Sequence, residues 1–262
     1  TTVNDWHTCS HTDRINASNP CSEYMFLDDT ACNLASINLT KFYTPGKDYD
    51  VKSYKHAIAF WTVVLEISVA MASYPTKAIA ERSWSHRPLG LGYANLGALL
   101  MRQGLAYDSR KGRTLAAALT AILTGEAYWV SALLAQQQGA FAAFDENREP
   151  MLKVIQKHDS YADLLYETDP NYLTNQAQVS WNHAYAAGRE FGYRNSQISV
   201  IAPTGCLIPS SLVLTDRGLQ RLGNLGNRKG NQWQDAKFKV ATDQGPKDAT
   251  KFYINGVADV IR

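Results

Sequence analysis

The segment Asn19-Pro20-Cys21-Ser22-Glu23 places a carboxamide, a thiol and a carboxylate within five residues, and Cys32 follows shortly afterwards. Proline fixes its own φ near about −65° and biases the preceding residue toward extended geometry. Side chains i, i+2 and i+4 of an extended segment share one face, so we expect Asn19, Cys21 and Glu23 to converge on one small volume. The alternative is a buried Cys21 that packs as a small hydrophobe beside a solvated Glu23.

A longer stretch carries a family resemblance. Residues 14–39, RINASNPCSEYMFLDDTACNLASINL, resemble the catalytic segment of ribonucleotide reductases, and most closely that of the adenosylcobalamin-dependent (class II) catalytic chain. The short spacing between Cys21 and Cys32 is similar to this class, whereas the oxygen-dependent (class I) chain usually has a longer insertion there. The class I chain stays as an alternative.

The resemblance implies roles for these residues. Cys21 would carry a transient thiyl radical, Asn19 would hydrogen-bond the sugar hydroxyls, and Glu23 would act as general base on the ribose. Cys32 would be one of two thiols that reduce the substrate. The cofactor would be adenosylcobalamin and the reductant an external, thioredoxin-like dithiol. We expect ribonucleotides, as diphosphates, to be the substrates, and the fold to be part of a ten-stranded α/β barrel.

Composition sets limits on the class of protein. The 262 residues are 45% hydrophobic and 19% charged, which is ordinary for a globular chain. A net charge of +2 gives no reason to expect nucleic acid or a membrane as a stable partner, and no apolar run reaches about 18 residues. Four cysteines are too few for a disulfide scaffold, and the first residues do not resemble a signal peptide. We therefore expect a cytoplasmic protein with reactive thiols, and the missing initiator Met suggests a chain cut from a longer one.

Hydrophobic periodicity predicts a helix-rich region before residue 192. The expected helices cover 51–73, ending before Pro75; 109–137, with Asp108 or Ser109 as cap and Gly139 as its end; 144–158; and 174–190. Residues 87–101 begin extended and turn helical. Gly90 and Gly92 in that segment lack the full dinucleotide fingerprint, so we interpret them as sites of close backbone packing beside a barrel strand.

The histidines stand alone in the sequence. His56, His86, His158 and His183 have no partner at metal-ligand spacing, so we predict surface or hydrogen-bonded histidines and no metal site.

Residues 193–201 are rich in β-branched side chains and predict a strand that runs into Ala202-Pro203-Thr204-Gly205. A turn of this kind exposes backbone N–H groups and a hydroxyl, which suits an anion, although a purely structural turn has the same letters. In the reductases that the chain resembles, this loop binds the substrate's phosphates.

The reductase pattern stops after Gly205. Residues 206–225 resemble the opening of an intein, with Cys206 first, then a short strand, a turn at Asp216-Arg217-Gly218 and a second strand. Residues 240–262 alternate like further intein strands. We therefore expect two domains, a reductase barrel fragment over 1–205 and a short all-β intein fragment over 206–262.

The intein resemblance gives Cys206 the role of splicing nucleophile, whose thiol attacks the carbonyl of Gly205 to form a thioester. The rest of the intein, the returning reductase segment and the upstream reductase part are then expected to lie outside this sequence. Two other readings remain open. The chain could be half of a split intein that binds a complementary half, or a plain helical binding scaffold with incidental cysteines.

Overall fold

The structure is a computed structural model that describes residues 2–203, 212–221, 224–225, 231–240 and 246–255. The chain divides into two compact units, Thr1–Thr204 and Gly205–Arg262. The units are described separately below as unit 1 and unit 2.

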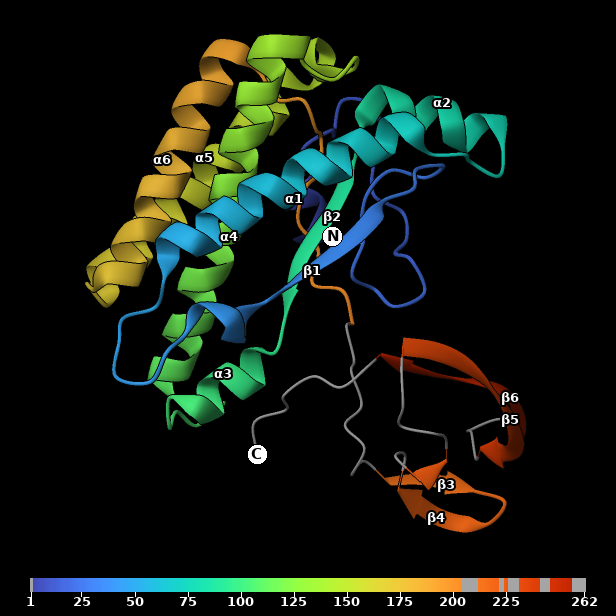
Figure 1. The fold of residues 1–262 in the computed structure, drawn as a ribbon. Coiled ribbons are helices and arrows are strands. Elements are labelled where there is room, and N and C mark those ends of the chain that lie inside the picture. Colours follow the sequence, from blue (N-terminus) through green and yellow to red (C-terminus); the bar gives the residue numbers. More distant parts are fainter. Residues whose placement is uncertain (1, 204–211, 222–223, 226–230, 241–245, 256–262) are drawn as a thin grey trace. The chain divides into compact units, whose positions relative to one another are not determined.

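Unit 1 is a helix-rich α/β unit (Figure 1). Its elements are η1 (Thr2–Trp6), β1 (Asn33–Asn38), η2 (Leu39–Phe42), α1 (Val51–Met71), α2 (Lys77–His86), β2 (Leu89–Ala94), α3 (Leu96–Arg102), α4 (Arg110–Gln138), α5 (Phe144–Thr168) and α6 (Tyr172–Phe191).

The predicted helices are present, and their ends follow local chemistry. The side chain of Asp50 accepts a hydrogen bond from the Ser53 N–H and caps α1. Ser109, rather than Asp108, caps α4 by accepting from the Gly112 N–H, and Gly139 at φ 83° ends that helix.

Two helical predictions were incomplete. Helix α5 runs to Thr168, ten residues past its predicted end, because no breaker intervenes and Ala162 on the added turns is buried. Helix α2 was not predicted at all, although Thr76 caps it with a hydrogen bond from the Ile79 N–H.

The two strands of unit 1 are parallel, and α1 and α2 form the crossover between them (Figure 1). The predicted strand over 193–201 bonds to β2 only from Gln197 onward among the described residues: the Leu89 and Leu91 N–H groups donate to the Gln197 and Ile198 carbonyls, and the Val200 N–H donates to the Leu91 carbonyl at 3.0 Å. The strand prediction was therefore too long. Residues Arg194 and Asn195 instead contact Glu66 on α1, which bends the segment before it reaches β2.

Glycines allow the three extended segments to approach one another. A Cβ on Gly90 would lie 2.4 Å from the Asn33 carbonyl oxygen, and one on Gly92 would lie 2.0 Å from the Val200 carbonyl oxygen. Such distances exclude any side chain, so close backbone packing is confirmed as the reason for both glycines.

Helix α4 lies in the core, beside α5 and α6 (Figure 1). It contains an 18-residue window apolar enough to cross a membrane by length and composition, with a mean hydropathy of 1.4, which the sequence reading had missed. Because 67% of that window is buried inside the protein, the apolar character matches that of a core helix.

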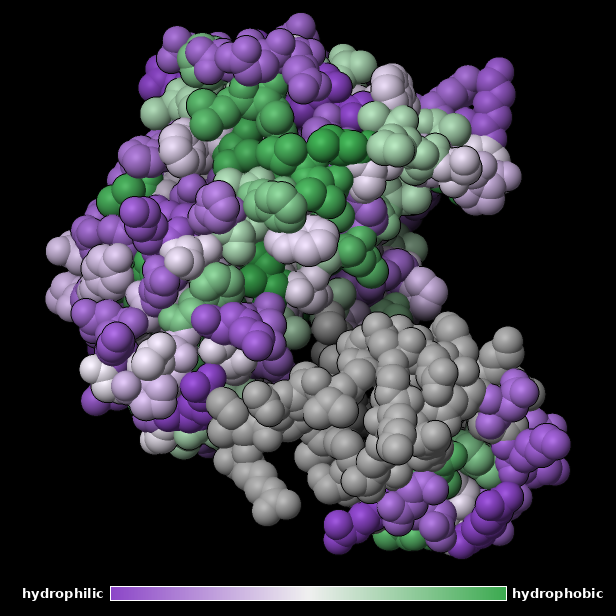
Figure 2. All heavy atoms as spheres, in the orientation of Figure 1, coloured by the Kyte–Doolittle hydropathy of each residue, from purple (hydrophilic) through white to green (hydrophobic). Residues whose placement is uncertain are grey.

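Helix α1 exposes several large apolar side chains, among them Phe60, Ile67 and Met71. Figure 2 shows apolar residues gathered on the face of the molecule that α1 occupies in Figure 1.

The regular elements of unit 2 in its described residues are all strands: β3 (Leu212–Thr215), β4 (Gly218–Arg221), β5 (Asn231–Val240) and β6 (Lys247–Asn255). They pair antiparallel in the order β4-β3-β5-β6. The predicted turn at Asp216-Arg217-Gly218 is confirmed, because β3 and β4 form a hairpin around it and Gly218 has φ 81°.

Candidate functional site

The segment around Cys21 is a tight turn, and the extended conformation predicted for it was wrong. The Ser22 N–H donates to the Asn19 carbonyl at 3.0 Å, and Ser22 has φ 64°. Pro20 therefore occupies the second position of a β-turn, where its fixed φ is favourable. In a turn, side chains at i, i+2 and i+4 do not point to one face as they do in an extended strand. The expected shared face of Asn19, Cys21 and Glu23 therefore does not follow.

Asn19 closes the base of this loop. Its N–H donates to the Tyr24 carbonyl at 3.1 Å, and its side-chain Oδ1 accepts from the Tyr24 N–H at 3.0 Å. The carboxamide thus shapes the loop, while Cys21 at the tip is exposed.

The residues after the tip anchor the loop to the core. Tyr24, Phe26 and Leu27 are buried, and the Ala31 N–H donates to Ser83 Oγ on α2 at 3.0 Å. An exposed thiol is therefore held on a fixed base, which is the arrangement that a positioned reactive group requires.

Cys32 and Glu23 act on one another electrostatically. Burial, and then the negative charge of Glu23, raise the pKa of the Cys32 thiol to about 12. Glu23 Oε2 is itself buried and has no hydrogen-bond partner within the described structure. Burying a carboxylate oxygen without a hydrogen-bond donor costs free energy. Glu23 Oε2 is therefore available to accept a hydrogen bond from a ligand.

The structure thus brings together part of the predicted set. Glu23 and Cys32 are neighbours, and Cys32 directly precedes β1. Cys21 stands at the loop tip, and Cys9, Cys21 and Cys32 are all free thiols.

The predicted anion loop is described only at its beginning. Ala202 is half-buried and Pro203 is exposed, and both are irregular. The predicted phosphate-loop residues Thr204 and Gly205, and the predicted splicing nucleophile Cys206, lie outside the described residues.

Sequence reasoning missed a buried ionic cluster centred on Glu66. Its Oε1 accepts from Arg87 Nε at 2.7 Å and from Arg194 Nε at 2.8 Å, and its Oε2 accepts from Asn195 Nδ2 at 2.7 Å. Glu66 is 5% exposed and Arg87 is 3% exposed. The signal was present in the sequence as a single acid on the apolar face of the 51–73 helix, which demands a buried partner.

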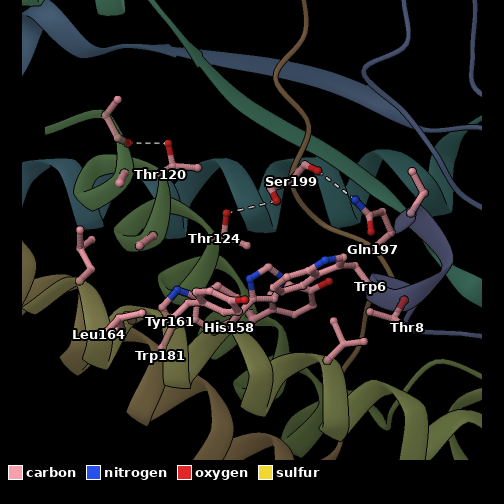
Figure 3. A pocket seen from close by; sticks show the side chains of 18 of the residues that line it. Trp6, Thr8, Thr120, Thr124, His158, Tyr161, Leu164, Trp181, Gln197 and Ser199 are labelled. Carbon is pink, nitrogen blue, oxygen red and sulfur yellow. Dashed lines mark hydrogen bonds between the residues drawn. The ribbon is translucent and has the colours of Figure 1, made fainter. Parts of the chain in front are cut away.

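The four histidines differ in their surroundings. His56 and His183 are exposed, and His86 Nδ1 lies 2.8 Å from Ser85 Oγ, as predicted. His158 departs from the prediction, because it is half-buried and stacks on Trp181 with ring centroids 4.7 Å apart. It lines a cavity of about 930 Å³ that contains none of Asn19, Cys21, Glu23 or Cys32 (Figure 3).

Comparison with known proteins identifies the family. Residues 1–215 match the model of the ribonucleotide reductase barrel domain, which extends ten residues past the predicted junction at Gly205. Similar proteins include the vitamin B12-dependent ribonucleotide reductases of Bradyrhizobium diazoefficiens (51% identical, covering 79% of this chain and 18% of the relative) and Rhodopirellula baltica (48%, covering 79% and 20%). A vitamin B12-dependent ribonucleoside-diphosphate reductase of Mycobacterium tuberculosis is 36% identical over 52% of this chain and 19% of the relative.

The chain therefore spans about a fifth of the length of these relatives. The match to the family model covers most of the chain and includes the loop that carries Cys21, the Glu23–Cys32 pair and the parallel strands β1 and β2. The chain belongs to the ribonucleotide reductase family, through its barrel domain.

Proposed function

We propose that residues 1–205 form part of the catalytic barrel of a vitamin B12-dependent reductase that converts ribonucleotides, as diphosphates, to deoxyribonucleotides. The relatives' names support the cofactor, and one of them supports the diphosphate. The observation that carries the proposal is the pair formed by Glu23 and Cys32.

The Cys32 thiol and the open oxygen of Glu23 suit different steps of the chemistry. A thiol reduces a sugar radical by giving up a hydrogen atom, so it has to stay protonated. The high pKa of Cys32 keeps its S–H bond intact at neutral pH. Glu23 offers a buried oxygen without a partner, which suits a base that accepts the proton of a ribose hydroxyl.

The exposed position of Cys21 fits a cofactor that approaches from outside this segment, because a thiol that exchanges a hydrogen atom must be reachable. Adenosylcobalamin, when bound, would supply the unpaired electron, and Cys21 is the residue that would face it. An external, thioredoxin-like dithiol would restore the reducing thiols after each turnover.

The steps then balance as follows. The Cys21 thiyl radical removes the 3′ hydrogen of the ribose, while Glu23 takes the proton of the 3′ hydroxyl. The 2′ hydroxyl takes a proton from one of the two reducing thiols and leaves as water. Cys32 and a second thiol supply two electrons as they form a disulfide, and Cys21 returns the 3′ hydrogen. Asn19 orders the loop through its bonds to Tyr24 and hydrogen-bonds the sugar hydroxyls.

The test is deoxyribonucleotide formation by the full-length enzyme with adenosylcobalamin and a dithiol. Cys21→Ser should abolish turnover, because an O–H bond is too strong to yield the radical. Cys32→Ser should leave the radical signal intact in electron paramagnetic resonance but stop normal product formation. Normal turnover by both variants would refute the roles assigned to the two thiols, and turnover without cobalamin would favour the class I chain.

We also propose that residues 206–262 are the N-terminal part of an intein. Three observations support this second function: the compact units divide beside Gly205, four strands are described after it, and relatives such as those of Bradyrhizobium diazoefficiens and Rhodopirellula baltica match 79% of the chain. The Cys206 thiol would attack the Gly205 carbonyl, which converts the peptide bond to a thioester and frees the amine of Cys206.

In a precursor that carries the complete intein and both flanking segments, Cys206→Ala should block ligation, and precursor should accumulate on a denaturing gel. With Cys206 intact, added thiol should release a fragment that ends at Gly205. Formation of ligated product by the Cys206→Ala precursor would refute the role of Cys206 as splicing nucleophile. Ligation only after mixing with a separate polypeptide would identify a split intein.

A further inference from the structure

One cavity of unit 1 lies among the helices and contains none of Asn19, Cys21, Glu23 or Cys32, although Ile15 and Met25 of the segment that carries the Cys21 loop line it. It measures about 930 Å³ and is lined by η1, α4, α5, α6 and residues Gln197 and Ser199. Ser199 faces it from beside β2, because its hydroxyl accepts from Thr124 Oγ1 on α4 at 3.2 Å. The volume lies within the range of small-molecule sites in proteins, about 300–1,000 Å³.

The sequence of α4 keeps this space open. Small side chains recur along one stripe of the helix where a core helix would place Leu or Ile, and they are Ala116, Ala117, Thr120, Ala121 and Thr124. A stripe of small residues does not make a site by itself. The other walls of the cavity carry the groups that could recognise a ligand, namely aromatic rings and polar side chains.

Aromatic rings form one of those walls (Figure 3). His158 lies between Trp6, with ring centroids 4.6 Å apart, and Trp181, at 4.7 Å, and Tyr161 extends the row at 5.6 Å from Trp6. Thr120, Thr124, Ser199 and Gln197 lie across the cavity from this row in Figure 3. The space thus lies between ring surfaces and a line of hydroxyl and amide groups.

The cavity lacks formal charge. Among the described residues that line it, none is Asp, Glu, Lys or Arg. Lys157 lies nearby, but its ammonium group sits 3.8 Å from the Trp6 ring centroid, outside the lining. Burial also lowers the pKa of His158 to about 4, so the imidazole is neutral at physiological pH. A phosphate or carboxylate would find no counter-charge here, and a cation would find no carboxylate.

We propose that this cavity binds an uncharged, flat heteroaromatic molecule of about two fused rings. Its faces contact the aromatic row, and its polar edge pairs with the hydroxyl and amide groups of Thr124, Ser199 and Gln197. Offset and edge-to-face contacts between aromatic rings favour such a ligand over an aliphatic one of equal size. None of the residues assigned to the proposed reduction chemistry, Asn19, Cys21, Glu23 and Cys32, lines this cavity.

Quinoline tests the proposal, because it is bicyclic, neutral at pH 7.5 and carries one acceptor nitrogen. Isothermal titration calorimetry of the 262-residue chain should show one site for quinoline. The cation N-methylquinolinium and the anion quinoline-2-carboxylate, which have the same ring system, should bind at least tenfold more weakly. Equal affinity for the three compounds would overturn the proposal.

Variants locate the site. Ala121→Phe should fill the cavity and abolish quinoline binding while far-UV circular dichroism stays unchanged, whereas Met101→Ala on the exposed end of α3 should bind like the parent chain. If Ala121→Phe fails to fold, Ser199→Ala should weaken binding about threefold to tenfold through the lost hydroxyl. Undiminished binding by a folded Ala121→Phe chain would show that quinoline binds outside this cavity, and this result would overturn the proposal. A parent chain that sediments as a dimer and becomes a monomer with Ala121→Phe would show that a second copy occupies the cavity, which also overturns the proposal.

Discussion

Glu23 and Glu66 are both acids in largely buried surroundings of unit 1, and they differ in how their oxygens are used. Both carboxylate oxygens of Glu66 accept short hydrogen bonds, from Arg87, Arg194 and Asn195. Glu23 Oε2 has no partner within the described structure, although it is buried. A buried carboxylate with every oxygen satisfied holds structure together, whereas one with an open oxygen is available for chemistry.

The surroundings of the two acids also differ: Glu66 links elements of the fold, whereas Glu23 lies beside an exposed loop. Glu66 joins α1 to Arg87, before β2, and to Arg194, before the segment that pairs with β2, so it ties elements that are far apart in sequence. Glu23 follows a turn with an exposed tip and influences Cys32. Three variants test this contrast, and they are given in order of decreasing effect on stability.

Glu66→Ala should have the largest effect on stability. It leaves the buried guanidinium of Arg87 and the partly buried one of Arg194 without their counter-charge, and loss of one member of such a cluster costs about 3–5 kcal/mol. The measurement is the free energy of unfolding of the chain in urea. Glu190→Ala on the exposed face of α6 is the control and should change it by less than about 0.5 kcal/mol. Equal effects of the two variants would show that the Glu66 cluster contributes no net stability.

Asn19→Ala should have an intermediate effect. It removes the acceptor of the Tyr24 N–H, and an unsatisfied backbone donor at a buried residue costs about 1–3 kcal/mol. The loss should appear in urea unfolding and as faster amide hydrogen exchange at Tyr24. Asn16→Ala is a matched control, because among the described residues the side chain of Asn16 bonds to the exposed Asp28. Unchanged exchange at Tyr24 would contradict the capping role of Asn19.

Glu23→Gln should have the smallest effect on stability, within about 1 kcal/mol, because its open oxygen has no partner to lose. Its effect should appear at Cys32 instead. Removing the negative charge lowers the pKa of that thiol from about 12, while burial, the larger cause, keeps it above the ordinary value.

The measurement is the alkylation rate of Cys32 by iodoacetamide against pH, read by peptide mass spectrometry. At a fixed pH below 11 the variant should react faster at Cys32, because a lower pKa raises the thiolate fraction. Cys9 is an internal control. Burial raises its pKa to about 12 as well, and Glu23 is not among the causes. A rise at both cysteines would indicate loosening of the core rather than loss of a charge.

The sequence by itself determined the features that depend on neighbouring residues. The periodicity of 51–73, 109–137 and 174–190 predicted α1, α4 and α6, since a helix is defined by contacts three and four residues apart and by its caps. The Asp216-Arg217-Gly218 turn and the packing role of Gly90 and Gly92 followed from local backbone freedom in the same way.

Only the tertiary structure decided the features that join distant residues. Arg87 and Arg194 lie 21 and 128 residues from Glu66, and no local pattern specifies such partners. The parallel pairing of β1 with β2 depends on the α1–α2 crossover. The prediction of an extended segment over Asn19–Ser22 was wrong because Asn19 bonds to Ser22 and Tyr24 and closes a turn, which a residue before proline also permits. The sequence thus identified the chemical groups near Cys21, whereas long-range packing decided which of them are buried, exposed or unpartnered.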